Sequence, residues 1–224
     1  MFDGRYREPI EKIVKPIGIL LRKTGMSADQ LTILGLIIAA FAAVAIASGR
    51  LLLGFFLVIL AALPDLLDGA LAKASNSASQ RGAFFDSVID RVTDSLLLGG
   101  LTWYIGDEYG TNAAVVPFAI MAVSSLISYE RAKAESLGLS AKGGLMERAE
   151  RIVVLCFGLL FNAILMPVLW VMLVLTSMTA LQRFIKVWKQ AGVSSRTQDR
   201  RDLRRNKQSE RQNGEDGHHR TTSN

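Results

Sequence analysis

Four aspartates stand close together in a largely apolar part of the chain, PDLLDGALAKASNSASQRGAFFDSVIDR. Asp65 and Asp68 are three positions apart, and Asp86 and Asp90 are four apart, so each pair shares one face of a helix. Bare carboxylates gathered in apolar surroundings repel one another and become partly protonated, a conflict that a divalent cation removes. Hard oxygen ligands suit Mg²⁺, Mn²⁺ or Ca²⁺, and Mg²⁺ held by carboxylates typically completes its shell with substrate phosphates. The pattern therefore predicts a divalent metal site.

The surroundings of the acids support this interpretation. Residues 74–81 are short and polar, so the two flanking helices are predicted to be antiparallel neighbours that bring all four acids to one cavity. Gly69 and Gly82 beside them leave room for a phosphate or a base. Two alternatives are acids that merely face the membrane interface and a structural ion-pair cluster. Asp94 continues the row from Asp90, with Arg91 beside it, and we expect it in an ion pair.

The apolar residues come in uncharged blocks. Residues 31–49 carry no charge over 19 positions, residues 113–128 carry none, and residues 152–182 carry none over 31 positions. A bilayer core about 30 Å thick needs roughly 20 apolar helical residues to cross it. The chain is therefore predicted to be an all-α integral membrane protein.

Six membrane-spanning helices are expected, because the long last block divides at Asn162 and Pro167. Their predicted ranges are 31–49, 51–73, 83–106, 113–135, 147–162 and 166–189. Residues 8–24 alternate apolar and charged groups at helical spacing, which predicts an amphipathic helix on the membrane surface. The expected organisation is a cytoplasmic N-terminus over 1–26, a catalytic membrane domain over 27–189 and a disordered basic tail over 190–224.

The basic residues orient this arrangement. Six Lys and Arg precede the first span and eleven follow the start of the sixth, whereas Arg50 is the only one predicted on the opposite side. This asymmetry places both termini and the acids at the cytoplasmic face of a cell membrane. The tail is expected to touch anionic lipid headgroups rather than nucleic acid.

The acidic stretch resembles the signature of the CDP-alcohol phosphatidyltransferase family, D-x-x-D-G-x-x-A-R, about eight residues, then G-x-x-x-D-x-x-x-D. Here Asp65, Asp68, Gly69 and Ala72 are followed, after eight residues that separate Lys73 from Gly82, by Asp86 and Asp90. The one departure is Lys73 in place of Arg, which replaces a bidentate phosphate ligand with a point charge.

The resemblance implies a six-span, homodimeric fold that moves a phosphatidyl group from CDP-diacylglycerol to an alcohol and releases CMP. It implies Mg²⁺ or Mn²⁺ at Asp65, Asp68 and Asp86, with Asp90 at the same metal site as the general base. The residues implied to bind CDP-diacylglycerol are Gln30, Thr32, Asp68, Gly69, Ala72, Lys73 and Gly82. Gln30 and Thr32 come from SADQLT, which is similar to the family's TPNQLT, although a helix N-cap at Ser27 or Asp29 explains that stretch equally well.

Cytoplasmic cations beside the acids point to an anionic acceptor, most simply a phosphate ester. The candidates are Arg131, Lys133, Arg148, Arg151 and Arg183. Residues 129–151 resemble the Y-x-K-A-R-A-E … E-R-P-E-R region of actinobacterial phosphatidylinositol phosphate synthases. Here Lys and Arg exchange places at positions 131 and 133, and Ala149 replaces the Pro. We therefore favour inositol 1-phosphate as the acceptor.

Other interpretations stay open at this point. Phosphatidylglycerophosphate synthases, which use glycerol 3-phosphate, have a similar region. The same cations could serve only membrane orientation, and neighbouring glutamates could neutralise them. A cation transporter with an acidic intramembrane site is a further alternative, although transporters place such acids near the midplane and often at internal repeats.

Overall fold

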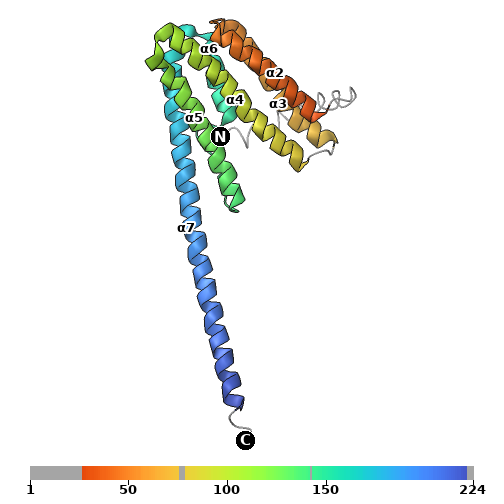
Figure 1. Cartoon of the computed structure of the whole chain (residues 1–224), viewed down its shortest axis with the longest axis vertical. Coiled ribbons are helices and arrows are strands. Elements are labelled where there is room, and N and C mark those ends of the chain that lie inside the picture. The colour runs from red at the N-terminus through yellow and green to blue at the C-terminus, as the bar shows by residue number, and fades with distance from the viewer. Residues whose placement is uncertain (1–26, 76–78, 142, 221–224) are drawn as a thin grey trace.

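The computed structural model describes residues 27–75, 79–141 and 143–220, without the side chains of residues 28, 65–75 and 193–220. The predicted amphipathic segment 8–24 lies outside the described residues, as does the rest of the N-terminal region up to residue 26. The described part is all-α (Figure 1). Its helices are α2 (Ala28–Ala47), α3 (Leu51–Ser75), α4 (Gln80–Tyr109), α5 (Thr111–Ser136), α6 (Arg148–Leu160), the 3₁₀ turn η1 (Asn162–Ile164) and α7 (Leu165–Arg220).

Local sequence signals explain where these helices begin and end. Ser27 is the N-cap of α2 in a capping box: its Oγ accepts from Gln30 N at 3.2 Å, and Gln30 Oε1 accepts from Ser27 N at 3.0 Å. The turns after α2 and α4 contain Gly49 and Gly110 at φ values of 75° and 90°, which favour glycine. Among the described residues, six α-helices follow one another in the region where six membrane spans were expected.

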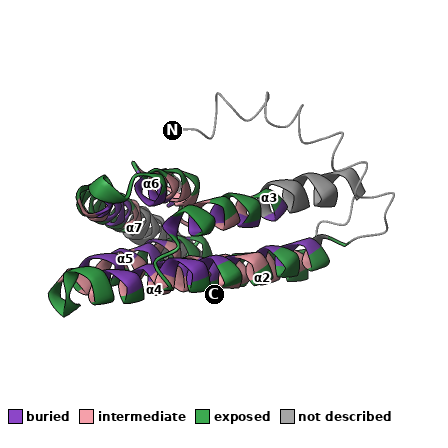
Figure 2. Ribbon diagram, turned by 90° about the horizontal axis from the view of Figure 1, so that it is seen from above, coloured by how far each residue is buried: buried purple, intermediate pink, exposed green. Residues whose placement is uncertain are grey.

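Three of these helices are long and apolar enough to cross a membrane: α2 over Asp29–Ala47, α5 over Thr111–Ser136, and Asn162–Gly192, which covers η1 and the start of α7. A shorter apolar segment, Leu51–Pro64, opens α3. Large apolar side chains are exposed around the bundle, including Phe41, Trp103 and Val153. In Figure 2 exposed stretches recur along the helices. Such an apolar exterior is typical of a protein surrounded by lipid.

Small residues let α2 pack between its neighbours. Gly100 of α4 lies so close to the carbonyl of Ala43 that a Cβ would collide with it, and a Cβ on Gly35 would come within 3.2 Å of Pro64 Cβ. Close approach through small residues is a common way to join membrane helices. The expectation that α3 and α4 are direct neighbours needs correction, because in the described residues α2 makes the main contacts with both.

The last helix is much longer than the predicted sixth span. Its 56 residues correspond to about 84 Å at 1.5 Å per residue, and Figure 1 shows α7 extending far beyond the other helices. We expected a disordered tail from residue 190, but α7 continues to Arg220. Residues 190–220 contain no proline and many Arg and Gln, which favour helix. Extending an existing helix also needs no new nucleus.

The loop between α5 and α6 is fastened to α7. Gln190 and the backbone of Ser140 exchange two hydrogen bonds of 3.1 and 2.8 Å, and Met146 N donates to Thr179 Oγ1 at 3.0 Å. Gly144 packs directly against Thr179. Because this loop leads into Arg148, the first residue of α6, these contacts fix where α6 begins.

Candidate active site

One cavity lies where four helices meet, and it contains the described members of the acidic motif. It is lined by Thr32, Gly35 and Leu36 of α2, Ala61 and Pro64 of α3, Asp86, Ile89, Asp90 and Thr93 of α4, and Arg148 of α6. Its walls combine apolar side chains with hydroxyls, two carboxylates and one guanidinium. Such a mixture suits a lipid-linked substrate with a charged head.

The structure brings Asp86 and Asp90 to this cavity from successive turns of α4. Asp65 and Asp68 belong to α3, but their side chains lie outside the described set. Pro64, directly before Asp65, lines the same cavity. The part of α3 directly before the first acidic pair therefore borders the cavity, and the convergence of all four acids stays a prediction.

These residues fit a divalent metal ion. Two half-buried carboxylates line one cavity, and carboxylate oxygens are the donors that Mg²⁺ and Mn²⁺ prefer. Among the described side chains no group of three or more His, Cys, Asp or Glu could hold a metal. That set leaves out Asp65 and Asp68, the other two predicted ligands.

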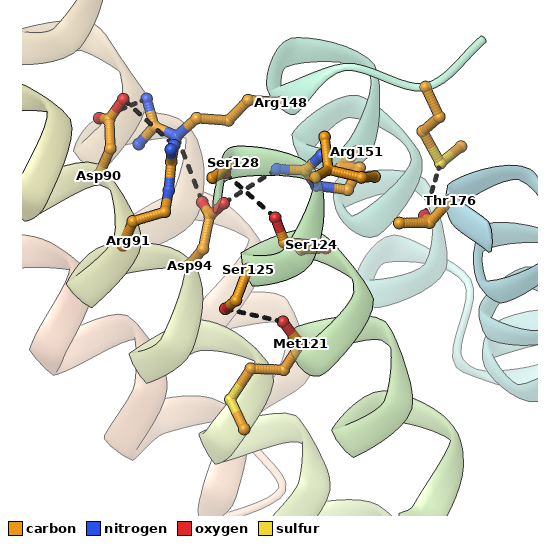
Figure 3. A network of polar contacts seen from close by, with 12 residues as sticks. Asp90, Arg91, Asp94, Met121, Ser124, Ser125, Ser128, Arg148, Arg151 and Thr176 are labelled. Carbon is orange, nitrogen blue, oxygen red and sulfur yellow. Dashed lines mark hydrogen bonds and ion pairs between the residues drawn. The ribbon is translucent and has the colours of Figure 1, made fainter. Parts of the chain in front are cut away.

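Arg148 lines the cavity and pairs with two aspartates of α4. Its Nη1 lies 2.8 Å from Asp90 Oδ1, and its Nε donates to Asp94 Oδ1 at 3.2 Å (Figure 3). Arg91 Nη2 lies 3.5 Å from the other oxygen of Asp90. Asp90 therefore lies between two guanidinium groups, one on each carboxylate oxygen.

Asp94 is in an ion pair, as expected, but its expected partner was wrong. We expected Arg91, the nearby cation in sequence, whereas Asp94 pairs with Arg148 and with Arg151, whose Nη2 lies 3.0 Å from Asp94 Oδ2. Arg91 turns instead to Asp90. The reason is tertiary: two arginine side chains from the first turn of α6 reach this face of α4 (Figure 3).

The five cations predicted for the acceptor fall into three groups. Arg148 lines the cavity, and Arg151 is buried behind it on Asp94. Arg183 is buried elsewhere: its guanidinium donates to the carbonyls of Gly143 and Ile127 and pairs with Glu147. Arg131 and Lys133 are exposed, and Arg131 pairs with Glu135 one turn along α5 at 3.0 Å. Of the five, the structure brings only Arg148 to the cavity.

The residues predicted to contact the nucleotide lie in different places. Thr32 is buried and lines the cavity, whereas the Gln30 side chain takes part in the α2 cap. Gly82 is half-buried near the start of α4, where its N–H donates to Ser79 Oγ at 3.0 Å. The side chains of Ala72 and Lys73, and the surroundings of Gly69, lie outside the described set. Thr93 also lines the cavity and was not predicted as a site residue. Its spacing of three residues from Asp90 could have indicated this, because it places both on one helix face.

Arg183 ties the loop before α6 to α5 and α7, so its replacement should destabilise the fold. Arg183→Gln removes a buried cation with three partners, and we expect a loss of about 3 kcal/mol, seen as a lower thermal midpoint in detergent. The matched control is Arg131→Gln, which removes an exposed pair worth about 0.5 kcal/mol or less. Equal midpoints for the two variants would contradict this role.

Comparison with known proteins identifies the chain. The family model described as CDP-alcohol phosphatidyltransferase matches residues 26–182. The chain belongs to the CDP-alcohol phosphatidyltransferase family. It is therefore an enzyme of that family, and the acidic motif, Thr32 and Arg148 all lie within the matched residues.

Named relatives of this phosphatidyltransferase cover most of its length. It is 36% identical over 185 residues to a phosphatidylinositol phosphate synthase of Mycobacteroides abscessus, which covers 79% of this chain and 84% of the relative. It is 32% identical over 193 residues to an archaetidylinositol phosphate synthase of Methanothermobacter thermautotrophicus, covering 83% of this chain and 94% of the relative.

Solved structures match the fold of this phosphatidyltransferase. A phosphatidylinositol phosphate synthase of Mycobacterium tuberculosis with CDP-DAG bound has a TM-score of 0.74 and 30% identity, covering 79% of this chain and 94% of that one. The same enzyme in complex with manganese and citrate has a TM-score of 0.73 and 30% identity, covering 78% and 88%. The predicted all-α fold of this family is confirmed by this match.

Proposed function

We propose that the chain transfers the phosphatidyl group of CDP-diacylglycerol to a hydroxyl of inositol 1-phosphate, giving phosphatidylinositol phosphate and CMP. The observation that carries the proposal is the 2.8 Å pairing of Arg148 with Asp90 at one cavity. A guanidinium there can bind an acceptor's phosphate, and the neighbouring carboxylate can take the acceptor's proton.

The names of the relatives favour this acceptor. The bacterial and archaeal relatives differ in the lipid part of their names, phosphatidyl against archaetidyl, but share inositol phosphate. The similarity to this chain is comparable for both, so the shared acceptor is the simplest assignment. Glycerol 3-phosphate is the second candidate, because it also carries a phosphomonoester that Arg148 could bind.

The proposed reaction is a substitution at phosphorus. The acceptor's hydroxyl oxygen bonds to the phosphorus that carries diacylglycerol, the bond from that phosphorus to the CMP oxygen breaks, and the hydroxyl proton passes to Asp90. Asp65, Asp68, Asp86 and Asp90 would hold Mg²⁺ or Mn²⁺, which would supply the positive charge that neutralises the diphosphate and stabilises CMP as the leaving group. Leu36, Ala61 and Ile89 form an apolar wall of this cavity, beside the reacting groups.

The remaining assignments belong to the same proposal. Thr32, Gly69, Ala72, Lys73 and Gly82 border the nucleotide and diphosphate. Of the five acceptor cations, Arg148 is the one that meets the acceptor's phosphate. The protein crosses the cell membrane six times as a homodimer, with both termini and the acids at the cytoplasmic face. The similarity to an enzyme solved with CDP-DAG supports the donor, and the basic residues support the orientation.

A panel of acceptors tests the proposal. Purified protein with Mg²⁺ and CDP-diacylglycerol is given inositol 1-phosphate, glycerol 3-phosphate, free inositol or serine, and CMP release is measured. We expect inositol 1-phosphate to give the highest kcat/KM, and free inositol to be at least about 100-fold poorer because Arg148 then lacks its charged partner. A preference for glycerol 3-phosphate would overturn the assignment of inositol 1-phosphate as the acceptor. Turnover of free inositol alone would overturn the role of Arg148 in binding the acceptor's phosphate.

A further inference from the structure

Asp94 joins the two arginines that begin α6. Its Oδ1 accepts from Arg148 Nε at 3.2 Å, and its Oδ2 accepts from Arg151 Nη2 at 3.0 Å (Figure 3). Each carboxylate oxygen therefore serves a different guanidinium. One acid of α4 supplies the counter-charge for two cations of another helix.

The two arginines need this counter-charge because of where they stand. Arg148 and Arg151 are three residues apart in the first turn of α6, so they share a face and repel each other. The N-terminus of a helix is also partially positive, which disfavours cations there. The Arg151 side chain is 6% exposed, so its charge is costly without a partner. Asp94, 13% exposed, meets both groups.

The contact at Nε determines how Arg148 lies. Asp94 holds the guanidinium near its base, and Nη1 at its far edge reaches Asp90 Oδ1 at 2.8 Å. Arg148 lines the cavity, whereas Arg151 does not. Arg148 is thus the cation presented to a ligand, and Arg151 stands behind it as a second partner of Asp94.

We propose that Asp94 is a positioning residue that fixes the distance between the acceptor's phosphate and Asp90. The inference rests on the proposed function and extends it to a residue outside the family signature. A phosphomonoester bound at the Nη edge of Arg148 lies within one guanidinium width of Asp90, because Asp94 prevents the Arg148 side chain from turning away. Arg151 holds Asp94 in place and does not bind the phosphate.

A double-mutant cycle tests this inference. Asp94→Asn keeps the size and one acceptor oxygen but removes the charge, and we expect the KM for inositol 1-phosphate to rise roughly 10- to 100-fold. The KM for CDP-diacylglycerol should stay within about twofold, since Asp94 does not line the cavity. In an Arg148→Gln background, Asp94→Asn should change the acceptor KM less than about threefold.

The matched control is Asp107→Asn, the same change at an exposed position of α4, which should leave both KM values unchanged. Multiplicative effects of Asp94→Asn and Arg148→Gln would overturn the inference, as would an equal rise in both KM values. Should Asp94→Asn fail to fold, Asp94→Glu keeps the charge on a longer side chain. We then expect a near-normal thermal midpoint with a raised acceptor KM, and a normal KM would refute the positioning role.

Failure of the proposed acceptor is distinguishable from failure of this inference. If only glycerol 3-phosphate is turned over, the same cycle is measured with it, because both acceptors carry a phosphomonoester. Coupling between Asp94 and Arg148 would then uphold the inference while overturning inositol 1-phosphate. An absence of turnover with every phosphorylated acceptor overturns both.

Discussion

Asp90→Asn is expected to lower the kcat of CMP release by about 10²- to 10⁴-fold, the usual contribution of a general base. The Asn side chain keeps the size of Asp90 and an oxygen for Arg148 Nη1, which lies 2.8 Å from Asp90 Oδ1. The cavity should therefore keep its shape while losing the group that takes the proton. The fall in kcat is measured from the initial rate of CMP release at saturating concentrations of both substrates.

The same variant separates the base from the metal ligands. Titration with Mn²⁺ and with CDP-diacylglycerol should give Kd values for Asp90→Asn within a few-fold of the unsubstituted protein, because Asp65, Asp68 and Asp86 remain. Asp107→Asn again serves as the control for loss of one α4 carboxylate. If Mn²⁺ binding disappears together with turnover, Asp90 is primarily a ligand and its assignment as base is wrong.

Removal of divalent metal is expected to reduce CMP release to the background rate. Four carboxylates in one apolar region cannot accept a diphosphate without a cation, because like charges would meet in a poorly solvated cavity. Excess chelator should abolish turnover, and added Mg²⁺ or Mn²⁺ should restore it. Helix content by circular dichroism should be unchanged, because the apolar contacts of α2 with α3 and α4 do not depend on the site.

Asp86→Asn tests whether Asp86 is one of the metal ligands. Loss of one carboxylate ligand should raise the Mn²⁺ concentration for half-maximal activity at least about tenfold. Mutation of residues that only hydrogen-bond to metal ligands already lowers metal affinity or activity by about that factor. Asp107→Asn should leave the half-maximal concentration unchanged. Full activity in chelator, or an unaltered Mn²⁺ dependence in Asp86→Asn, would be incompatible with a metal site on these acids.

The helices and the acidic motif were accessible from the sequence because both depend on local spacing. Uncharged blocks predicted where α2, α5 and the first part of α7 would lie, and i, i+4 spacing placed Asp86 and Asp90 on one face of α4. The end of α7 was missed because composition alone does not distinguish a solvated coil from the extension of an existing helix.

The partners of the arginines could not be predicted, because they join residues far apart in the sequence. Arg148 meets Asp94 across 54 positions, and Arg183 reaches Ile127 across 56. The loop between α5 and α6 leads directly into Arg148 and also accepts a hydrogen bond from Arg183 at the Gly143 carbonyl. Helix α7 fixes that loop through Thr179 and Gln190. Nearness in sequence favoured Arg91 as the partner of Asp94, whereas packing of α6 placed two other cations there.

The most direct test of the account follows the phosphate of the acceptor. Protein in detergent is incubated with CDP-diacylglycerol, Mg²⁺ and inositol 1-phosphate labelled with ³²P, and lipids are extracted. We expect label in a lipid of the mass of phosphatidylinositol phosphate, one equivalent of CMP for each labelled lipid, and neither product with chelator or with Asp90→Asn. Release of CMP without label in the lipid would contradict the proposed transfer.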